Sequence, residues 1–287
     1  MNAVIESTGL TKRYKDKMAL DHCDFRVETG RIVGLIGPNG AGKTTALKAI
    51  LGLTSYDGRL SVLGLDPFSQ RHQLMQDVCF IADVAILPRW IRVSDAITYV
   101  EGVHPRFDRS KCERFLAATQ IKMKSRVREL SKGMIAQLHL ALVMAIDARL
   151  LILDEPTLGL DILYRRRFYE QLLNDYFDET RTILVTTHQV EEIEHILTDL
   201  LFIKDGRIAL SATMDDVAER YIQVLVGADK ADTARMLNPI AERKMLGKSA
   251  FLYDGLPRQR AQELGEQFCK EHFPGHQALV CTHPDGH

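Results

Sequence analysis

A glycine-rich segment at positions 37–45 constrains this chain more than any other part of its sequence. It fits the pattern G-x-x-x-x-G-K-[ST], whose glycines let consecutive backbone N–H groups turn inward around anionic oxygens. An apolar run of strand length precedes it at 31–36, and helix-forming sequence follows at 45–51. A strand, a glycine loop and a helix in this order predict a phosphate site, because the positive end of the helix dipole meets the loop. The residues expected to bind a nucleotide here are Gly37, Pro38, Asn39, Gly40, Ala41, Gly42, Lys43, Thr44 and Thr45.

Two carboxylates at the end of a second apolar run fit the same chemistry. Asp154 and Glu155 directly follow Leu150–Leu153, which reads as a strand buried on both faces of a parallel sheet. Ligands bind outside the carboxyl ends of such strands. We therefore expect Lys43 to reach the β- and γ-phosphates, and Thr44 and Asp154 to hold Mg²⁺. Glu155 is expected to take a proton from an attacking water.

Bulk composition limits the classes of partner. The chain has 287 residues, with 37 lysines and arginines against 38 aspartates and glutamates, so a nucleic-acid partner is not expected. Five scattered cysteines without a C-x-x-C pair are typical of reduced thiols in a cytosol. We expect no secretory signal and no membrane-spanning segment, because no leader pattern and no run of about 18 apolar residues occurs.

Further segments of this sequence resemble the nucleotide-binding subunit of ATP-binding cassette (ABC) transporters. The segment 130–134, Leu-Ser-Lys-Gly-Met, resembles the family signature Leu-Ser-Gly-Gly-Gln, and 156–161, Pro-Thr-Leu-Gly-Leu-Asp, resembles its D-loop. His188 resembles the switch histidine, and Tyr14 stands where the family places an aromatic residue under adenine. These segments occur in the family's order and extend over residues 1 to about 220.

The resemblance implies a role for each matching residue. Tyr14 would stack on adenine, and His188 would hydrogen-bond the γ-phosphate or the attacking water. Ser131, Lys132 and the Gly133 backbone would contact ATP held by a second cassette subunit. In that arrangement, a homodimer or heterodimer closes around two MgATP. Catalysis would rest on Glu155, His188 and Lys43, and the D-loop residue Asp161 would cross the dimer interface.

The sequence departs from the family pattern at two places. Lys132 and Met134 replace a glycine and a glutamine of the signature, while Ser131 and Gly133 remain. At the position of the family's Q-loop glutamine, this chain has Asp83. A carboxylate can ligate Mg²⁺ but cannot donate a hydrogen bond when ionised, so coupling to a membrane partner is expected to differ here.

The resemblance also implies a fold and its domains. We expect an α/β P-loop fold of ABC type over residues 1–221, with a RecA-like core, an N-terminal antiparallel β subdomain and a helical signature subdomain at about 84–145. Residues 222–287 predict a small α+β extension in the order β-α-β-β-α-β, which is a ferredoxin-like pattern and a candidate dimerisation or regulatory domain. Its expected strands are 222–226, 244–248, 250–253 and 278–281, and its helices are 231–237 and 258–272.

The tail of the extension carries histidines that invite a metal interpretation. Their spacing matches no tight zinc pattern, so we expect solvated side chains and no metal there. The residues concerned are His272, His276, Cys281, His283 and His287.

The function implied by the resemblance is ATP hydrolysis that drives a separate transmembrane permease. The signature variants resemble the subfamily that pairs with export permeases of ABC-2 type, which would place the chain on the cytoplasmic face of the cell membrane. A soluble ATPase acting on ribosomes or DNA is the alternative, disfavoured by the single cassette and the balanced charge. A regulatory protein that holds ATP without turnover is disfavoured by Glu155 and His188. The sequence does not name the transported molecule.

Overall fold

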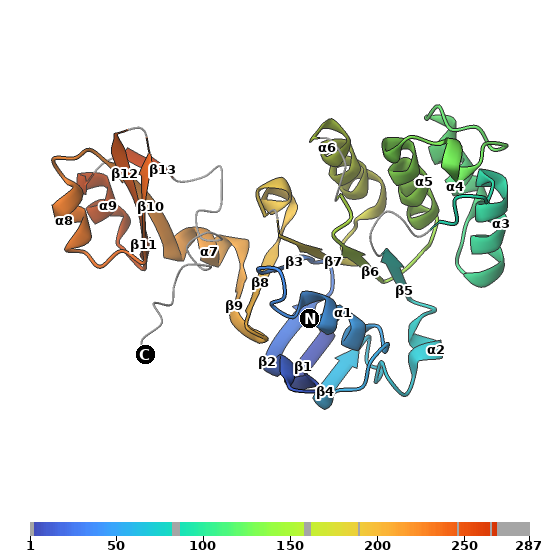
Figure 1. Cartoon of the computed structure of the whole chain (residues 1–287), viewed down its shortest axis with the longest axis horizontal. Helices are drawn as coiled ribbons and strands as arrows, with labels where there is room; N and C mark the ends of the chain where they lie inside the picture. The colour runs from blue at the N-terminus through green and yellow to red at the C-terminus, as the bar shows by residue number, and fades with distance from the viewer. Residues whose placement is uncertain are drawn as a thin grey trace.

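A six-stranded sheet forms the centre of the computed structural model, which describes residues 3–81, 87–157, 162–188, 190–245, 247–264 and 266–268 (Figure 1). The strand order is β5-β6-β7-β3-β8-β9. Every neighbouring pair is parallel except β8 and β9, which form an antiparallel hairpin. The strands are β3 (Ile32–Ile36), β5 (Val78–Ile81), β6 (Leu150–Asp154), β7 (Thr182–Thr187), β8 (Asp199–Lys204) and β9 (Arg207–Thr213).

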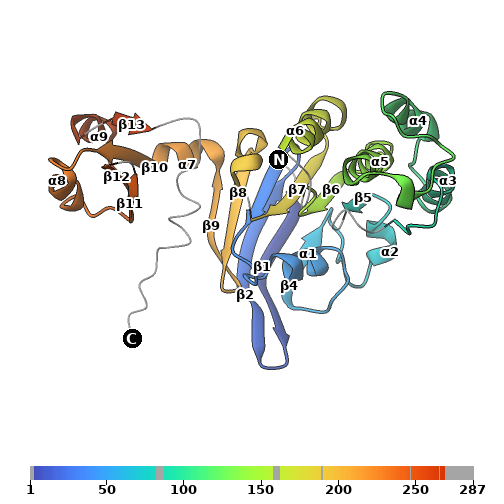
Figure 2. The ribbon, with the colours of Figure 1, turned by 45° about the horizontal axis from the view of Figure 1, so that its top comes forward.

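The central strands are apolar on both faces because each face packs against its own core. In β6, Leu151 and Leu153 belong to one core, whereas Leu150 and Ile152 belong to the other. Helices α5 (Lys132–Met144) and α6 (Ile162–Gln171), with the π-helix η2 (Leu172–Tyr176), cover the first face. Figure 2 shows these helices on one side of the sheet and α1 on the other. The continuous apolar runs in the sequence are thus explained by burial on two sides.

A second, antiparallel sheet covers the other side of the core. It contains β1 (Ala3–Tyr14), β2 (Lys17–Glu28) and β4 (Asp57–Val62), in the order β2-β1-β4. Helix α1 (Lys43–Ile50) contributes Ala46, Leu47 and Ile50 to the core that both sheets share. The antiparallel β subdomain predicted from the sequence is therefore confirmed.

A group of helices at one end of the molecule has a core of its own, as the predicted helical subdomain requires. It contains α3 (Val93–Val103), α4 (Arg109–Ala117) and the short η1 (Val127–Glu129), which pack against α5. Asp108 caps α4, because its carboxylate accepts the Lys111 N–H at 3.0 Å. The remaining short helices of the core are α2 (Arg71–Leu74), η3 (Val190–Glu192) and η4 (Glu194–Ile196).

A small α+β unit lies at the opposite end of the molecule, beyond α7 (Met214–Arg220) (Figure 1). Its antiparallel sheet has the order β11-β12-β10-β13. The elements follow the expected order β-α-β-β-α-β. They are β10 (Tyr221–Val226), α8 (Ala231–Arg235), β11 (Ala241–Met245), β12 (Lys248–Asp254), α9 (Arg258–Leu264) and β13 (Glu266–Phe268).

Two boundaries predicted for this unit are wrong. The expected strand 244–248 runs across a turn, since β11 ends at Met245 and Gly247 has a φ of 81°. The expected helix 258–272 stops at Leu264, because the next residues pair with β10 as strand β13. The expected strand at 278–281 and the tail histidines lie outside the described residues. No helix of the described part of the chain combines the length and the apolar character needed to cross a bilayer.

Candidate functional site

The glycine loop connects β3 to α1, and the chain around it explains why glycine is needed. A Cβ atom at Gly37 would lie 2.2 Å from the carbonyl oxygen of Ile203. Gly42 has a φ of 116°, and a Cβ there would lie 2.6 Å from the carbonyl oxygen of Ala19. Neither position can accept a side chain without moving a neighbouring strand, so the loop conformation depends on these glycines.

The start of α1 leaves its backbone donors available to an anion. The N-cap residue Gly42 offers no side chain to accept the first N–H groups of the helix. Lys43 is the first helical residue and is buried, and its Nζ donates to the carbonyl oxygens of Gly37 at 2.7 Å and Pro38 at 3.2 Å. Burial lowers the pKa of Lys43, and the charges of Glu155 and Asp154 oppose that shift.

The two predicted carboxylates extend from the end of β6 toward the same region. Asp154 lies opposite Thr186 of β7, whose hydroxyl donates to Asp154 Oδ1 at 2.5 Å. Thr186 also accepts the Glu155 N–H through its carbonyl oxygen at 3.1 Å. Thr186 is not among the site residues predicted from the sequence; its signal is a polar side chain in a mostly apolar strand, two positions before His188.

Glu155 and His188 form a direct pair. The Nδ1 atom of His188 lies 2.9 Å and 3.0 Å from the two carboxylate oxygens of Glu155, so Nδ1–H donates to the carboxylate. This arrangement fixes the carboxylate and leaves Nε2 of the histidine for another partner. Glu155 has a φ of 48°, a left-handed conformation that is strained for a glutamate and often marks a functional position.

A cavity of about 400 Å³ beside the glycine loop brings half of the predicted site residues together, and His188 is not among them. Tyr14 is 43% exposed at its edge, with Lys12 Nζ 5.2 Å from the centre of its ring. Lys17 and Ala19, which are not among the residues predicted from the sequence, also line the cavity. The lining residues are Tyr14, Lys17, Ala19, Asn39, Gly40, Gly42, Lys43, Thr44, Thr45, Asp154 and Glu155.

The signature residues do not join this cavity within one chain. Ser131 caps α5, and its hydroxyl accepts the Met134 N–H at 3.2 Å. Ser131 and Lys132 are exposed, at the N-terminal end of α5. None of the residues 131–133 lines the cavity beside the glycine loop. The predicted Asp83 and Asp161 lie outside the described residues.

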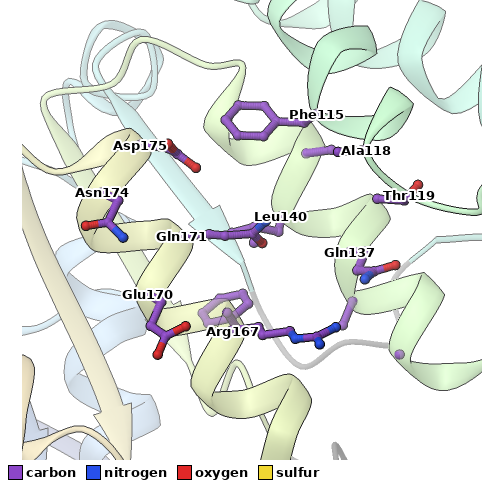
Figure 3. Close-up of a pocket in the computed structure, with 14 residues that line it drawn as sticks. Phe115, Ala118, Thr119, Gln137, Leu140, Arg167, Glu170, Gln171, Asn174 and Asp175 are labelled. Carbon is purple, nitrogen blue, oxygen red and sulfur yellow. The ribbon is translucent and has the colours of Figure 1, made fainter.

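A second cavity of about 400 Å³ lies between α4, α5, α6 and η2. Figure 3 shows Arg167 extending from α6 toward α5 and Gln137, with Glu170 and Asn174 farther along the same wall. Gly133 of the signature lines it, but the glycine loop, Asp154 and Glu155 do not. It therefore lacks the glycine loop and the carboxylates at the end of β6 that line the first cavity.

A buried polar cluster connects the segments that follow Glu155 and His188. The Thr157 and Tyr169 hydroxyl oxygens lie 3.3 Å apart, and Thr157 Oγ1 donates to Glu192 at 3.5 Å. Glu192 also forms an ion pair with Arg165 of α6. Tyr169 is 1% exposed, and burial raises its pKa. This cluster ties α6 and η3 to the chain beside the carboxylate pair.

Comparison with known proteins gives a consistent family. A family model described as ABC transporter matches residues 20–158, and a model of an AAA domain matches residues 124–194. A Nod factor export ATP-binding protein I of Rhizobium etli is 32% identical over 89% of this chain and 84% of its own length. A protein of the same name from Burkholderia thailandensis is 34% identical over 88% of this chain and 86% of its own length.

Solved structures share the fold. A structure described as the ATP binding subunit of an ABC transporter matches with a TM-score of 0.67 and 25% identity, over 75% of this chain and 91% of its own. A bacterial Atm1-family ABC exporter with ATP bound matches with a TM-score of 0.63 over 76% of this chain and 40% of its own. Its identity of 19% supports a likeness of fold alone.

Proposed function

This chain belongs to the ABC transporter family as an ATP-binding subunit with ATPase activity, and we propose that it powers an exporter through a separate transmembrane permease. The observation that carries the proposal is one cavity lined by the glycine loop, Asp154 and Glu155, with His188 hydrogen-bonded to Glu155. Export comes from the relatives, whose names describe export ATP-binding proteins. The permease would determine which molecule is transported.

Different parts of the cavity suit the adenine ring and the phosphates of ATP. Tyr14 offers a flat, half-exposed ring for stacking against adenine at one edge. The backbone N–H groups of the loop and of the first turn of α1 would surround the phosphates, with Lys43 at their centre. For Lys43 to reach a phosphate, its Nζ would exchange the carbonyl oxygens of Gly37 and Pro38 for phosphate oxygens.

The donor set also fits Mg²⁺, which prefers oxygen ligands and retains water. Thr44 and Asp154 both line the cavity, and the described residues contain no cluster of three or more metal-ligating side chains. Such a set suits an ion that arrives with the phosphates rather than one held by the protein alone. We propose that Thr44 and Asp154 hold Mg²⁺, and Asp83 remains a predicted third ligand.

Loss of the Thr186 hydroxyl should weaken the magnesium site without removing a ligand. Thr186→Val keeps the side-chain shape but removes the hydroxyl, which donates to Asp154 at 2.5 Å and accepts the Glu155 N–H at 3.3 Å. Groups that orient a metal ligand typically contribute 10- to 100-fold in affinity, so we expect about a tenfold rise in the Mg²⁺ concentration for half-maximal ATPase activity. Thr187→Val is the control, because Thr187 is buried on the opposite face of β7. Equal shifts in both variants would contradict the role of Thr186.

Hydrolysis would use the Glu155–His188 pair as one unit. Glu155 would accept a proton from the attacking water, and its φ and the His188 hydrogen bond hold the carboxylate in place. The Nε2 atom of His188 would contact the γ-phosphate or the water. The nucleotide supplies the phosphoryl group and Mg²⁺ supplies charge neutralisation, while the chain supplies orientation and the proton acceptor.

A complete site would need a second cassette. Ser131 and Lys132 are exposed and do not line the cavity of their own chain, which supports their action on ATP held by a partner subunit. The Gly133 N–H and the Ser131 hydroxyl would face the γ-phosphate, with Lys132 adding positive charge nearby. Asp161 is proposed to cross the interface between the two subunits.

The permease is proposed to dock near Asp83 and the helices that follow it, which would hold the chain at the cytoplasmic face of the cell membrane. The decisive experiment is co-expression with the membrane protein encoded beside this chain. We expect the two proteins to co-purify and the ATPase rate to rise in the complex. Steady hydrolysis without a membrane partner, together with association with ribosomes or DNA, would overturn the transporter assignment.

Residues 222–287 are proposed to form an accessory domain for dimerisation or regulation, separate from the ABC domain at 1–221. In support, β10, β12, α8 and α9 share a core of their own, which includes Val224, Phe251 and Ala261. We expect truncation after Tyr221 to lower the dimer fraction measured by light scattering or to change the ATPase rate. A truncated chain with unchanged oligomeric state and unchanged turnover would contradict the proposal.

A further inference from the structure

Two hydrogen bonds join the segment after β6 to the segment after β7. One is the bond between His188 Nδ1 and Glu155, at 2.9 Å. The other is a long hydrogen bond farther along both segments, where the Thr157 hydroxyl donates to the Glu192 carboxylate at 3.5 Å. Neither Thr157 nor Glu192 lines the nucleotide cavity. The segments that carry the proposed proton acceptor and its histidine are therefore linked a second time, away from the reacting groups.

Helix α6 holds this second link through two side chains that lie about one helical turn apart. Arg165 forms an ion pair with Glu192, and the two side chains are 21% and 23% exposed. The Tyr169 hydroxyl oxygen lies 3.3 Å from that of Thr157. Thr157 has one hydroxyl proton, which it donates to Glu192, so Tyr169 donates to Thr157. Burial raises the pKa of Tyr169, as do the charges of Glu192 and Glu155, so the phenol keeps the proton that it donates.

Apolar contacts attach α6 and η3 to the core beside these polar groups. Phe168 of α6 and Val190 and Ile193 of η3 are buried in the core that also contains side chains of β6 and β7. Removing two charges from water costs free energy that their attraction does not always recover, so a partly buried ion pair is weak evidence for stability. Apolar packing is thus sufficient to hold η3 on the core, and the ion pair of Arg165 and Glu192 points to a role in orientation.

Glu155 is fixed on both sides along the chain. Its N–H donates to the Thr186 carbonyl oxygen at 3.1 Å, and the nearby Thr157 is 5% exposed. A left-handed φ, such as the 48° of Glu155, persists where surrounding contacts determine it. The Glu155 carboxylate therefore has a fixed position against which the histidine ring must be aligned.

His188 lies in a short connection between two elements. Strand β7 ends one residue before it, and η3 begins two residues after it. The strand ladder therefore does not fix the histidine, and the next fixed point along the chain is η3. There, Glu192 contacts both Arg165 and Thr157. The position of η3 thus determines how the His188 ring meets Glu155.

We propose that Glu192 is a positioning residue for His188. Held by Arg165 and Thr157, it fixes η3 and so aligns the histidine ring with the Glu155 carboxylate. This inference deepens the proposed function, on which it rests for the roles of His188 and Glu155. A displacement of about 1 Å at a reacting group can cost about 10²-fold in rate, so the rate of hydrolysis depends on this alignment.

The first test is Glu192→Gln, which keeps the size of the side chain and still accepts from Thr157 but has no charge to attract Arg165. We expect kcat for ATP hydrolysis at saturating Mg²⁺ to fall about tenfold, with the KM for ATP unchanged. The Tm without nucleotide should also stay unchanged, because apolar contacts hold η3. Arg166→Gln with Glu170→Gln is the matched control, since it removes an exposed ion pair of 2.8 Å on the same helix and should leave kcat unchanged.

Nuclear magnetic resonance of isotope-labelled histidine rings reads the alignment directly, without ATP or permease. The chain has 10 histidines, and the His188 signal is the one lost in His188→Ala. We expect Glu192→Gln to shift the Nδ1 signal of His188 toward that of a ring without its carboxylate partner, for which Glu155→Ala is the reference. Thr157→Val, which removes one contact of Glu192, should shift it in the same direction. The control pair on α6 should leave it in place.

Two results would overturn this inference alone. One is an unchanged kcat in Glu192→Gln. The other is a lower kcat with an unmoved His188 signal, or with a lower Tm and a higher KM, which would indicate a structural role of Glu192 apart from the histidine. Absence of ATP hydrolysis by the unmodified chain and its permease complex would instead contradict the proposed function, and the histidine signals would still test the positioning of His188.

Discussion

Replacing Glu155 with glutamine is expected to lower the ATPase rate by at least about 10²-fold while ATP binding remains. The amide has the size of the carboxylate but cannot take a proton from water, and proton transfer by a positioned side chain contributes typically 10²- to 10⁴-fold. The amide oxygen can still accept the hydrogen bond from His188 Nδ1, which joins the two residues at 2.9 Å. The local geometry, and with it the nucleotide cavity, should therefore persist.

The measurement compares phosphate release with binding of a fluorescent ATP analogue, at saturating Mg²⁺. Glu170→Gln is the matched control, because Glu170 is an exposed glutamate of α6 outside the nucleotide cavity. We expect this control to hydrolyse ATP normally. If Glu155→Gln kept near-normal turnover, the assignment of Glu155 as general base would be wrong, and another group would have to accept the proton.

The sequence predicts those parts of the fold whose signals are local. The runs at 31–36 and 150–153, which form β3 and β6, are mostly apolar because both faces of the sheet are covered. The order β5-β6-β7-β3-β8-β9 is different, since it depends on β3 pairing with β7 and β8, whose residues lie more than a hundred positions away. Only the family resemblance made that arrangement an expectation.

The extension shows where local signals fail. The sequence 244–253 contains two strands, but periodicity alone does not locate the turn between them, and Gly247 with its positive φ marks it instead. The pattern after Leu264 continues to look helical, yet strand β13 forms because β10 presents an unpaired edge. Tertiary pairing overrides local propensity in this segment.

The candidate site was predictable as a set of residue types, but the supporting contacts were not. The glycine loop and the carboxylates stand in recognisable patterns, so the sequence indicates them directly. Thr186 and Tyr169 carry no such pattern, and their roles appear only when β6, β7 and α6 are packed together. The φ of Glu155 likewise follows from the turn after β6, which no propensity predicts.

Replacing Lys43 with methionine is expected to abolish most ATPase activity without destabilising the free protein. Lys43 is 7% exposed and donates to two carbonyl oxygens, and burial of its charge lowers its pKa. Replacing a buried charge with an apolar side chain of similar size is often neutral or stabilising, so the Tm without nucleotide should stay unchanged or rise. With phosphates present, the lost cation should cost about 10²- to 10³-fold in turnover, as removal of one such electrostatic donor typically does.

Thermal unfolding with and without MgATP separates the two roles of this lysine. A ligand that binds only the folded state raises the Tm, so the unmodified chain should gain stability with ATP and Lys43→Met should gain much less. Lys48→Ala is the control, because Lys48 is exposed on the same helix and does not line the cavity. A lower Tm of nucleotide-free Lys43→Met, together with a normal ATP-induced rise in Tm, would mean that Lys43 stabilises the glycine loop and does not bind the phosphates. An unchanged or higher Tm without nucleotide, together with a smaller ATP-induced rise, would show that Lys43 contributes to phosphate binding and not to the stability of the free protein.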